Sequence, residues 1–117
     1  MVIIGCARAC DQGWLRDLTD RFGLQARLAE GGERWDLFVD EQGNVRGGGQ
    51  VISCGMDRRC TLTASSLLQD GWLATLQRTM CTLWGQEIQP REVPLTGLPR
   101  GRELTAAALL LLVGHCI

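Results

Sequence analysis

The chain has 117 residues, a length that fits one domain with a hydrophobic core of its own. Its net charge of −1 comes from 13 acidic and 12 basic residues spread along the sequence, so no cationic face indicates nucleic acid or anionic lipid as a partner. All the basic residues are arginines, which excludes a lysine Schiff base and the lysine-containing phosphate-binding loop, and the single histidine, His115, excludes a multi-histidine metal cage.

The two ends of the sequence predict a cytosolic protein. The start, MVIIGCARAC, lacks the basic residues and the long apolar stretch of a secretory signal. In a reducing compartment the six cysteines are expected as thiols rather than disulfides. The apolar end, LTAAALLLLVGHCI, is shorter than the roughly 20 residues that cross a bilayer. It is therefore expected to form a core or interface helix, and no membrane association is expected.

A buried strand and a helix are predicted first. The run MVIIGCA (1–7) is continuous, apolar and rich in β-branched residues, which is typical of a strand covered on both faces. The next segment, 11–23, predicts a helix with Asp11 as its N-cap and Gly23 as a left-handed C-terminal cap. Its apolar stripe has helical spacing and consists of Trp14, Leu15, Leu18 and Phe22.

Two alternating segments, 24–30 and 34–40, predict strands that are half exposed to solvent. The turn residues EQGN then favour a hairpin that returns through 45–55. Three successive glycines, Gly47 to Gly49, would weaken a regular ladder in the returning arm. They are interpreted as a bulge or as the start of the next strand.

A strand and a second helix are predicted for the middle of the chain. The segment CTLTAS (60–65) alternates between polar and apolar residues and predicts a strand. Apolar residues three to four positions apart then predict a helix over 66–85. This helix would begin at a capping box of Ser66 and Gln69, or at Asp70.

The last two elements complete the predicted fold class. The extended segment 86–95 contains two prolines, which place it at a sheet edge, and 101–117 predicts a helix with almost no polar face. In a small domain such a helix lies deep in the fold or meets another chain. The order of elements favours a single α+β domain over 1–117, with a mixed, mostly antiparallel sheet and about three helices packed mainly on one face.

A ligand site is one of two interpretations of the polar segments in the middle of the chain. The run GNVRGGGQ could hold an anion against its backbone N–H groups, with arginine counter-charges, or its glycines could serve conformation alone. The segment CGMDRRCTLTASS is either a turn with a half-solvated strand or a polar row that lines a pocket. The candidate ligand-binding residues are Arg46, Gly47, Gly48, Gly49, Arg58, Arg59, Thr61, Thr63 and Ser65.

The cysteines carry a further alternative. Three residues separate Cys6 from Cys10 and five separate Cys54 from Cys60, and neither spacing is the C-x-x-C of zinc and thiol redox sites. Four thiolates from two adjacent loops would make a metal or redox site, whereas the usual role of a free cysteine is that of a small buried residue. A dyad of Cys54 and His115 is the nucleophile and base that the composition allows. No resident metal or cofactor is expected.

One resemblance concerns the second half of the chain. The segment CGMDRRCTLTASS, followed by LQRTMCTLWGQEIQPREVPL, resembles a stretch of the form C-G-x-x-x-x-x-T-x-T-x-S-S in a family of small bacterial proteins of no known activity. Where that family has a Lys-Asp pair, this chain has Arg59 and Cys60. The resemblance implies a bacterial cytosolic origin and no particular chemistry.

Three functional hypotheses follow. The first is a non-enzymatic domain that associates with itself or with a protein partner, because the apolar C-terminal helix and four tryptophans exceed what short strands cover. The second is a small-molecule or anion-binding domain that uses the candidate ligand residues. The third is a thiol site. Whether the chain is an enzyme is left open by the sequence.

Overall fold

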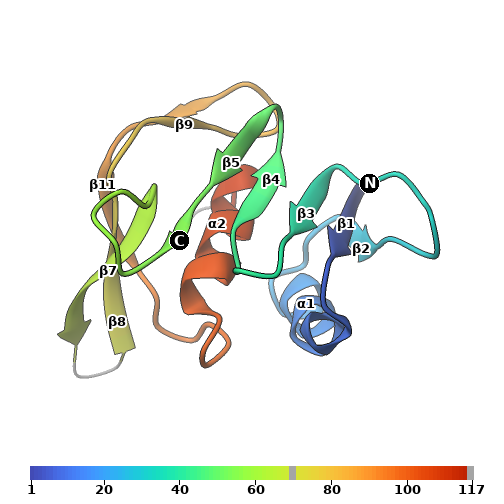
Figure 1. Cartoon of the computed structure of the whole chain (residues 1–117), viewed down its shortest axis with the longest axis horizontal. Helices are drawn as coiled ribbons and strands as arrows, with labels where there is room; N and C mark the ends of the chain where they lie inside the picture. Colours follow the sequence, from blue (N-terminus) through green and yellow to red (C-terminus); the bar gives the residue numbers. More distant parts are fainter. Residues whose placement is uncertain (69–70, 116–117) are drawn as a thin grey trace.

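The computed structural model describes residues 1–68 and 71–115 and places two β-sheets around one buried helix (Figure 1). The elements in chain order are β1 (Val2–Cys6), the short 3-10 helix η1 (Ala9–Asp11), α1 (Gln12–Arg21), β2 (Ala26–Leu28), β3 (Leu37–Val39), β4 (Val45–Gly47), β5 (Gln50–Ile52), β6 (Cys54–Gly55), β7 (Leu62–Leu68), β8 (Gly71–Leu76), β9 (Met80–Cys81), β10 (Glu87–Ile88), β11 (Arg91–Pro94) and α2 (Glu103–Leu112). This is an α+β fold, as the sequence predicts.

The first sheet has the strand order β2-β1-β3-β4-β5 and mixes two kinds of pairing. β1 pairs in parallel with β2 and with β3, and α1 forms the crossover between β1 and β2. β3, β4 and β5 follow one another as antiparallel neighbours. The predicted first strand, the first helix and the hairpin are confirmed, but β1 is not fully covered on both faces, because Ile3 and Cys6 are half-buried.

The second sheet has the order β11-β8-β7-β6, and β9 with β10 forms a separate two-stranded sheet. β11 pairs with β8 along an edge of the second sheet and ends at Pro94. A proline is tolerated there because it lacks the N–H group that a central strand would need. The predicted edge strand in the segment 86–95 is therefore confirmed.

The predicted helix over 66–85 is wrong. Residues Leu62–Leu68 and Gly71–Leu76 form the antiparallel strands β7 and β8 instead. In β8 the buried residues Ala74 and Leu76 alternate with more exposed ones, as is typical of a strand. Apolar residues four positions apart fit a helix, but they also fit this period of two, so their spacing did not distinguish the two structures. This error accounts for the predicted third helix, because α1 and α2 are the α-helices of the described residues. The proposed capping residues Gln69 and Asp70 lie outside the described residues.

The glycine run is a turn, not a bulge or a strand start. Gly47 pairs with Gln50 across β4 and β5, and Gly48 and Gly49 connect the two strands with φ values of 60° and 78°. Two successive left-handed residues make the tight hairpin turn that matches the twist of the flanking strands, and glycine adopts that conformation without strain.

Helix α2 is enclosed by the rest of the chain. The eight residues from Thr105 to Leu112 are all buried, and α2 contacts β4 of the first sheet as well as β6 and β7 of the second. In Figure 1 the helix lies between the two sheets. Of the two alternatives for this apolar helix, burial within the fold is the observed one.

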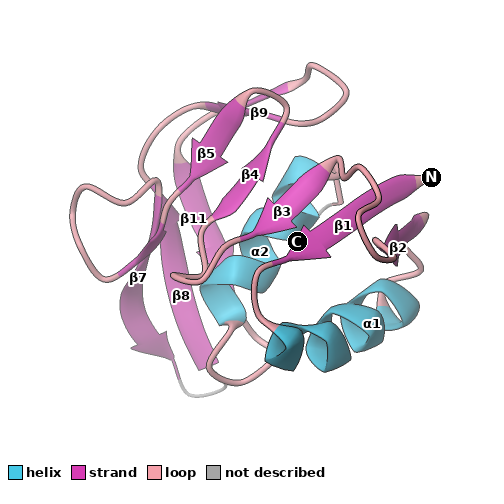
Figure 2. Ribbon diagram, turned by 45° about the vertical axis from the view of Figure 1, so that its right-hand side comes forward, coloured by secondary structure: helices cyan, strands magenta, loops and turns pink. Residues whose placement is uncertain are grey.

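The helices cover only the inner face of the first sheet (Figure 2). Leu15 and Leu18 of α1 join the same buried cluster as Ile4, Leu37 and the residues of α2. The opposite face carries Arg46 and Val51, which are exposed, beside the half-buried Phe38. The prediction of helices mainly on one face holds for this sheet, with two helices in place of about three.

Asp11 joins the two helices instead of capping α1. Its side chain makes no capping hydrogen bond, although it stands at the N-cap position. The buried carboxylate accepts hydrogen bonds from Trp14 Nε1 at 2.8 Å and from Arg102 Nε at 3.0 Å. Arg102 is the N-cap residue of α2, so this contact fixes the start of α2 against the start of α1. Neither helix of the described chain is long and apolar enough to cross a membrane.

Candidate ligand-binding site

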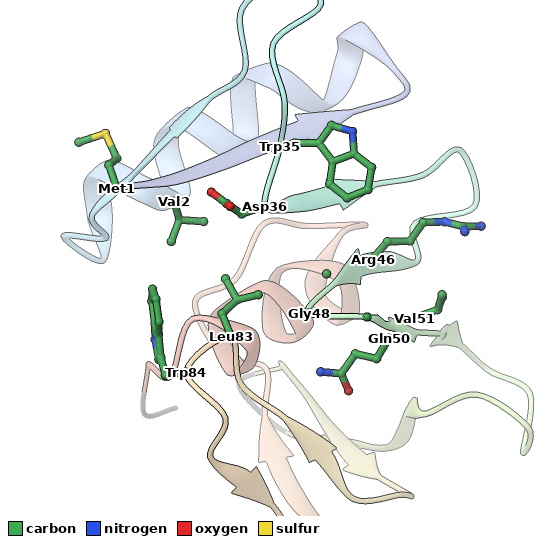
Figure 3. A pocket seen from close by; sticks show the side chains of 12 residues that line it. Met1, Val2, Trp35, Asp36, Arg46, Gly48, Gln50, Val51, Leu83 and Trp84 are labelled. Atoms are coloured by element: carbon green, nitrogen blue, oxygen red, sulfur yellow. The ribbon is translucent and has the colours of Figure 1, made fainter.

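A cavity of about 720 Å³ lies at the rim where β1 and β3 begin and β4 turns into β5 (Figure 3). Its other wall is the segment that follows β9. This volume is within the range of small-molecule sites. The lining residues are Met1, Val2, Trp35, Asp36, Arg46, Gly47, Gly48, Gly49, Gln50, Val51, Leu83 and Trp84.

Three polar groups of the lining already have partners inside the protein. Asp36 Oδ2 accepts a hydrogen bond from the Ile3 N–H at 2.8 Å. The Gln50 amide bonds the backbone of Cys81 at both its N–H and its carbonyl oxygen, which ties β5 to β9. Trp84 Nε1 donates to the Val113 carbonyl oxygen at 3.0 Å, which holds the indole against the end of α2. These groups therefore shape the cavity walls.

Arg46 supplies the charge that remains available. Its side chain is 53% exposed, and its Nε lies 3.8 Å from Asp40 Oδ2. Asp40 in turn accepts hydrogen bonds from the N–H groups of Gln42 and Asn44, so the carboxylate is shared with the hairpin loop. Within residues 1–68 and 71–115, no acceptor lies within hydrogen-bond distance of the terminal Nη atoms of Arg46. A guanidinium in this state can bind a carboxylate or phosphate in bidentate fashion.

Two indoles flank the cavity. Trp84 is 63% exposed and Trp35 is 45% exposed, values that are high for the largest apolar side chain. Trp35 contacts Phe38, with ring centroids 5.1 Å apart. Gly5 lies beneath this pair, because a Cβ atom there would be 2.9 Å from Phe38 Cδ2 and 3.3 Å from Trp35 Cδ1. Figure 3 shows Trp35 and Trp84 on opposite flanks, with Val2 and Leu83 between them.

The structure brings together only part of the predicted ligand set. Arg46, Gly47, Gly48 and Gly49 line the cavity, whereas the other five candidates do not. Arg58 and Arg59 are exposed in the turn between β6 and β7. Those five residues therefore lie outside the lining of this cavity.

The predicted polar row of the segment 61–65 is not a row. Thr61 is buried, and its Oγ1 lies 3.3 Å from Ser53 Oγ. Thr63 is half buried, and Ser65 is exposed and donates to the Leu73 carbonyl oxygen at 3.0 Å. The register between β7 and β8 shifts between Ala64 and Ser66, so the strict alternation ends there. These hydroxyls serve the architecture of the second sheet.

The two indoles are the part of the site that sequence reasoning missed. The alternating pattern of the segment 34–40 would place Trp35 on the same face as Leu37, but β3 begins only at Leu37, so the pattern does not position Trp35. Trp84 stands next to Gly85, and no local pattern distinguishes it from a core residue. Its position follows from the hydrogen bond to Val113, 29 residues further along the chain.

The four candidate metal-binding cysteines separate into two pairs. Cys6 and Cys10 flank the bend after β1, whereas Cys54 is the first residue of β6 and Cys60 lies in the turn between β6 and β7. In the described ranges no group of three or more His, Cys, Asp or Glu side chains is placed to hold a metal ion. Burial, with smaller effects of Cys60 and Asp40, raises the pKa of Cys54 to about 12. The Cys54 thiol is therefore protonated and shielded.

The predicted dyad of Cys54 and His115 is also wrong. Cys54 Sγ lies 3.7 Å from the Leu104 carbonyl oxygen at the start of α2, whereas His115 follows the end of that helix. The helix separates these positions by roughly 15 Å at 1.5 Å per residue. His115 instead packs edge-on against Phe22, with ring centroids 5.2 Å apart.

The chain matches no protein-family model, no curated protein and no solved structure.

Proposed function

We propose that the chain is a small-molecule-binding domain whose cavity takes a planar organic anion. One observation carries the proposal: Arg46, whose Nη atoms are available, is a lining residue of the same cavity as two exposed tryptophans. Of the other polar lining groups, Asp36 accepts one hydrogen bond through Oδ2, and Gln50 and Trp84 Nε1 are engaged within the protein. A ligand that fits has one flat apolar part and one anionic end.

Physical chemistry supports each half of this ligand. Indole faces bind planar apolar groups through offset or edge contacts worth about 0.5–1.5 kcal/mol beyond the buried area. A hydrogen bond to a charged group contributes about 1.5–3 kcal/mol. Gly48 and Gly49, the turn residues between β4 and β5, also line the cavity. An aromatic carboxylate is the simplest molecule that meets all these requirements.

The experiment titrates the full chain separately with an aromatic carboxylate, an aryl phosphate and a neutral aromatic amide of the same shape. Tryptophan fluorescence is the signal that reports binding. We expect binding of the anions and weaker binding of the amide. Arg46→Gln should weaken anion binding by roughly 10- to 100-fold, because it removes one charge-assisted contact. Arg91→Gln is the matched control, since Arg91 is exposed on β11 and away from the cavity.

Two results would end this proposal. Equal affinity of Arg46→Gln and Arg91→Gln for the anions would remove the role of Arg46. Equal binding of the anions and the neutral amide would show that the cavity does not select charge.

Self-association is the second candidate, favoured by the uncovered outer face of the first sheet. The Trp35–Phe38 pair and Val51 lie on this face and leave apolar area in solvent. The apolar helix α2 cannot itself form the interface, because it is buried. If a second copy of the chain binds this face, the mass measured by light scattering should exceed that of a monomer. Phe38→Ser should then return the measured mass to that of a monomer. A constant monomer mass over a wide concentration range would remove this candidate.

The cellular setting is part of the same proposal. A bacterial, cytosolic origin is supported by the resemblance of the segment 54–66. No nucleic-acid partner is proposed, since the net charge is −1.

A further inference from the structure

A second cavity, of about 290 Å³, adjoins the cavity proposed to bind the ligand. Apart from Val2 and Trp84, it is lined by the ranges 22–26, which follow α1, and 113–115, which follow α2. We call it the side cavity, and the larger one the ligand cavity. Val2 and Trp84 line both of them. These two residues therefore make the boundary between the cavities.

The indole of Trp84 is the part of this boundary that projects from the fold, since it is 63% exposed. Seen from the ligand cavity, the ring stands on the flank opposite Arg46 (Figure 3). Gly114 of the side cavity lies against the same ring, because a Cβ atom at Gly114 would be 3.4 Å from Trp84 Cδ1 and 3.5 Å from Nε1. The ring of Trp84 thus stands between Gly114 and the ligand cavity.

Hydrogen bonds hold this ring in one position. Trp84 Nε1 donates to the Val113 carbonyl oxygen at 3.0 Å. The backbone is fixed as well, because the Leu83 N–H donates to the Leu112 carbonyl oxygen at 2.8 Å. The Trp84 N–H donates to Oγ1 of the buried Thr82 at 3.2 Å. An indole that is tied through both its ring and its backbone is suited to close a cavity, although it is exposed.

Val2 is the fixed half of the boundary. It is 7% exposed and belongs to the hydrophobic core. In β1 it pairs with Ala26 of β2, and its N–H donates to the Gln25 carbonyl oxygen at 2.9 Å. Truncation of Val2 would disturb the core and the sheet, whereas Trp84 can be shortened with little loss of buried area. Trp84 is therefore the residue at which the boundary can be opened.

The side cavity suits an apolar group. Among the described residues that line it there is no arginine, aspartate or glutamate. The ring of His115 packs edge-on against Phe22, and Leu24 and Val113 are half-buried beside the core. An apolar extension of a ligand could be buried here while its anionic end stays at Arg46.

We propose that Trp84 limits the length of the ligand. Its indole closes the ligand cavity against the side cavity, so the site selects compact aromatic anions over those with a long apolar extension. A side chain that blocks part of a pocket discriminates against larger ligands by steric clash. This inference rests on the proposed function, because the anionic end of the ligand must be held at Arg46. Without the indole, an apolar extension would reach the range 22–26.

The test is a series of para-alkylbenzoates, from methyl to octyl, titrated separately into the full chain by isothermal titration calorimetry. Each methylene that becomes buried should raise the affinity roughly fourfold. In the parent protein we expect this rise to stop at the chain length that reaches Trp84. In Trp84→Ala the rise should continue, so that para-octylbenzoate binds at least roughly tenfold more tightly than it binds the parent.

Nuclear magnetic resonance locates the extension. Gly23 and Gly114 line the side cavity alone, whereas Gly48 and Gly49 line the ligand cavity alone. In Trp84→Ala, para-octylbenzoate should shift the backbone N–H signals of all four glycines. In the parent protein it should leave the signals of Gly23 and Gly114 in place.

Trp84→Leu is a second variant, which keeps an apolar side chain and should extend the series by a smaller step. Because Trp84 is largely exposed, both variants should keep the circular dichroism spectrum of the parent. Trp72→Ala is the matched control, since Trp72 is exposed on β8 and lines neither cavity. It should leave the dependence on chain length unchanged.

Two results would overturn this inference and leave the proposed function in place. One is the same length limit in the parent and in Trp84→Ala. The other is an affinity that rises through the octyl member in the parent itself. If para-methylbenzoate binds neither the parent nor Trp84→Ala, the proposed function fails, and this inference fails with it.

Discussion

Leu110→Ala distinguishes a core helix from an interface helix. Leu110 has no exposed surface and lies in the middle of the buried run of α2. Truncation removes three carbons and leaves a hole between two sheets whose strands are fixed by pairing, so the site has little freedom to collapse. Leucine-to-alanine substitutions at such sites cost about 3–5 kcal/mol. This is a large part of the roughly 5–15 kcal/mol that a domain has in total.

Urea unfolding followed by circular dichroism measures this loss, with light scattering on the same samples. Val51→Ala is the matched control, because Val51 is 48% exposed and its truncation should change the free energy of unfolding by less than about 0.5 kcal/mol. The mass of the parent and of both variants should be the same. A loss below about 1 kcal/mol for Leu110→Ala, together with a change in mass, would refute the placement of α2 in the core of one chain.

Three further substitutions test separate parts of the structure. Gly47→Ala should lower the free energy of unfolding by about 1–3 kcal/mol, because the new Cβ would lie 2.9 Å from the Asp36 carbonyl oxygen. Gly48→Asn should be nearly neutral, because asparagine tolerates the left-handed conformation of the turn. Equal losses for the two variants in urea unfolding would contradict this explanation. Arg102→Met should lower the free energy of unfolding by about 2–3 kcal/mol, because it removes a hydrogen bond and the counter-charge from the buried Asp11. Arg100→Met is the control, and an equally small loss of stability in both variants would show that the contact with Asp11 does not stabilise the fold. Stability should fall with a slope of up to about 1.4 kcal/mol per pH unit between pH 9 and 12, because the unfolded Cys54 thiol loses its proton near 9.0 while the folded one keeps it to about 12. Lysine and tyrosine are absent from the chain, so thiols dominate this range, and Cys54→Ala should flatten the slope; an unchanged slope would exclude Cys54 as its cause.

The parts of the fold that follow from the sequence are those set by local patterns. The continuous apolar run of β1, the stripe of α1 and the turn residues before Val45 each specify one structure over a few neighbouring residues. The apolar helix α2 was also predictable, since nothing in it favours another conformation. Its burial between two sheets required the structure, because the covering strands come from distant segments.

The parts that the sequence could not predict depend on long-range partners. β8 is a strand because β7 and β11 pair with it on both sides, and its apolar spacing is equally compatible with a helix. Of the candidate site, Arg46 and the glycine run were accessible from composition and spacing. The tryptophans were not, because Trp84 is positioned by Val113 and Trp35 by Gly5 and Phe38.

The most direct test of the cavity as the binding site is a two-dimensional ¹H–¹⁵N NMR titration of the full chain with an aromatic carboxylate. We expect saturable shifts of the indole N–H signals of Trp35 and Trp84 and of the backbone signals of Gly48 and Gly49, while the indole signals of Trp14 and Trp72 stay in place. Shifts confined to Trp72, or spread evenly over the surface without saturation, would contradict it.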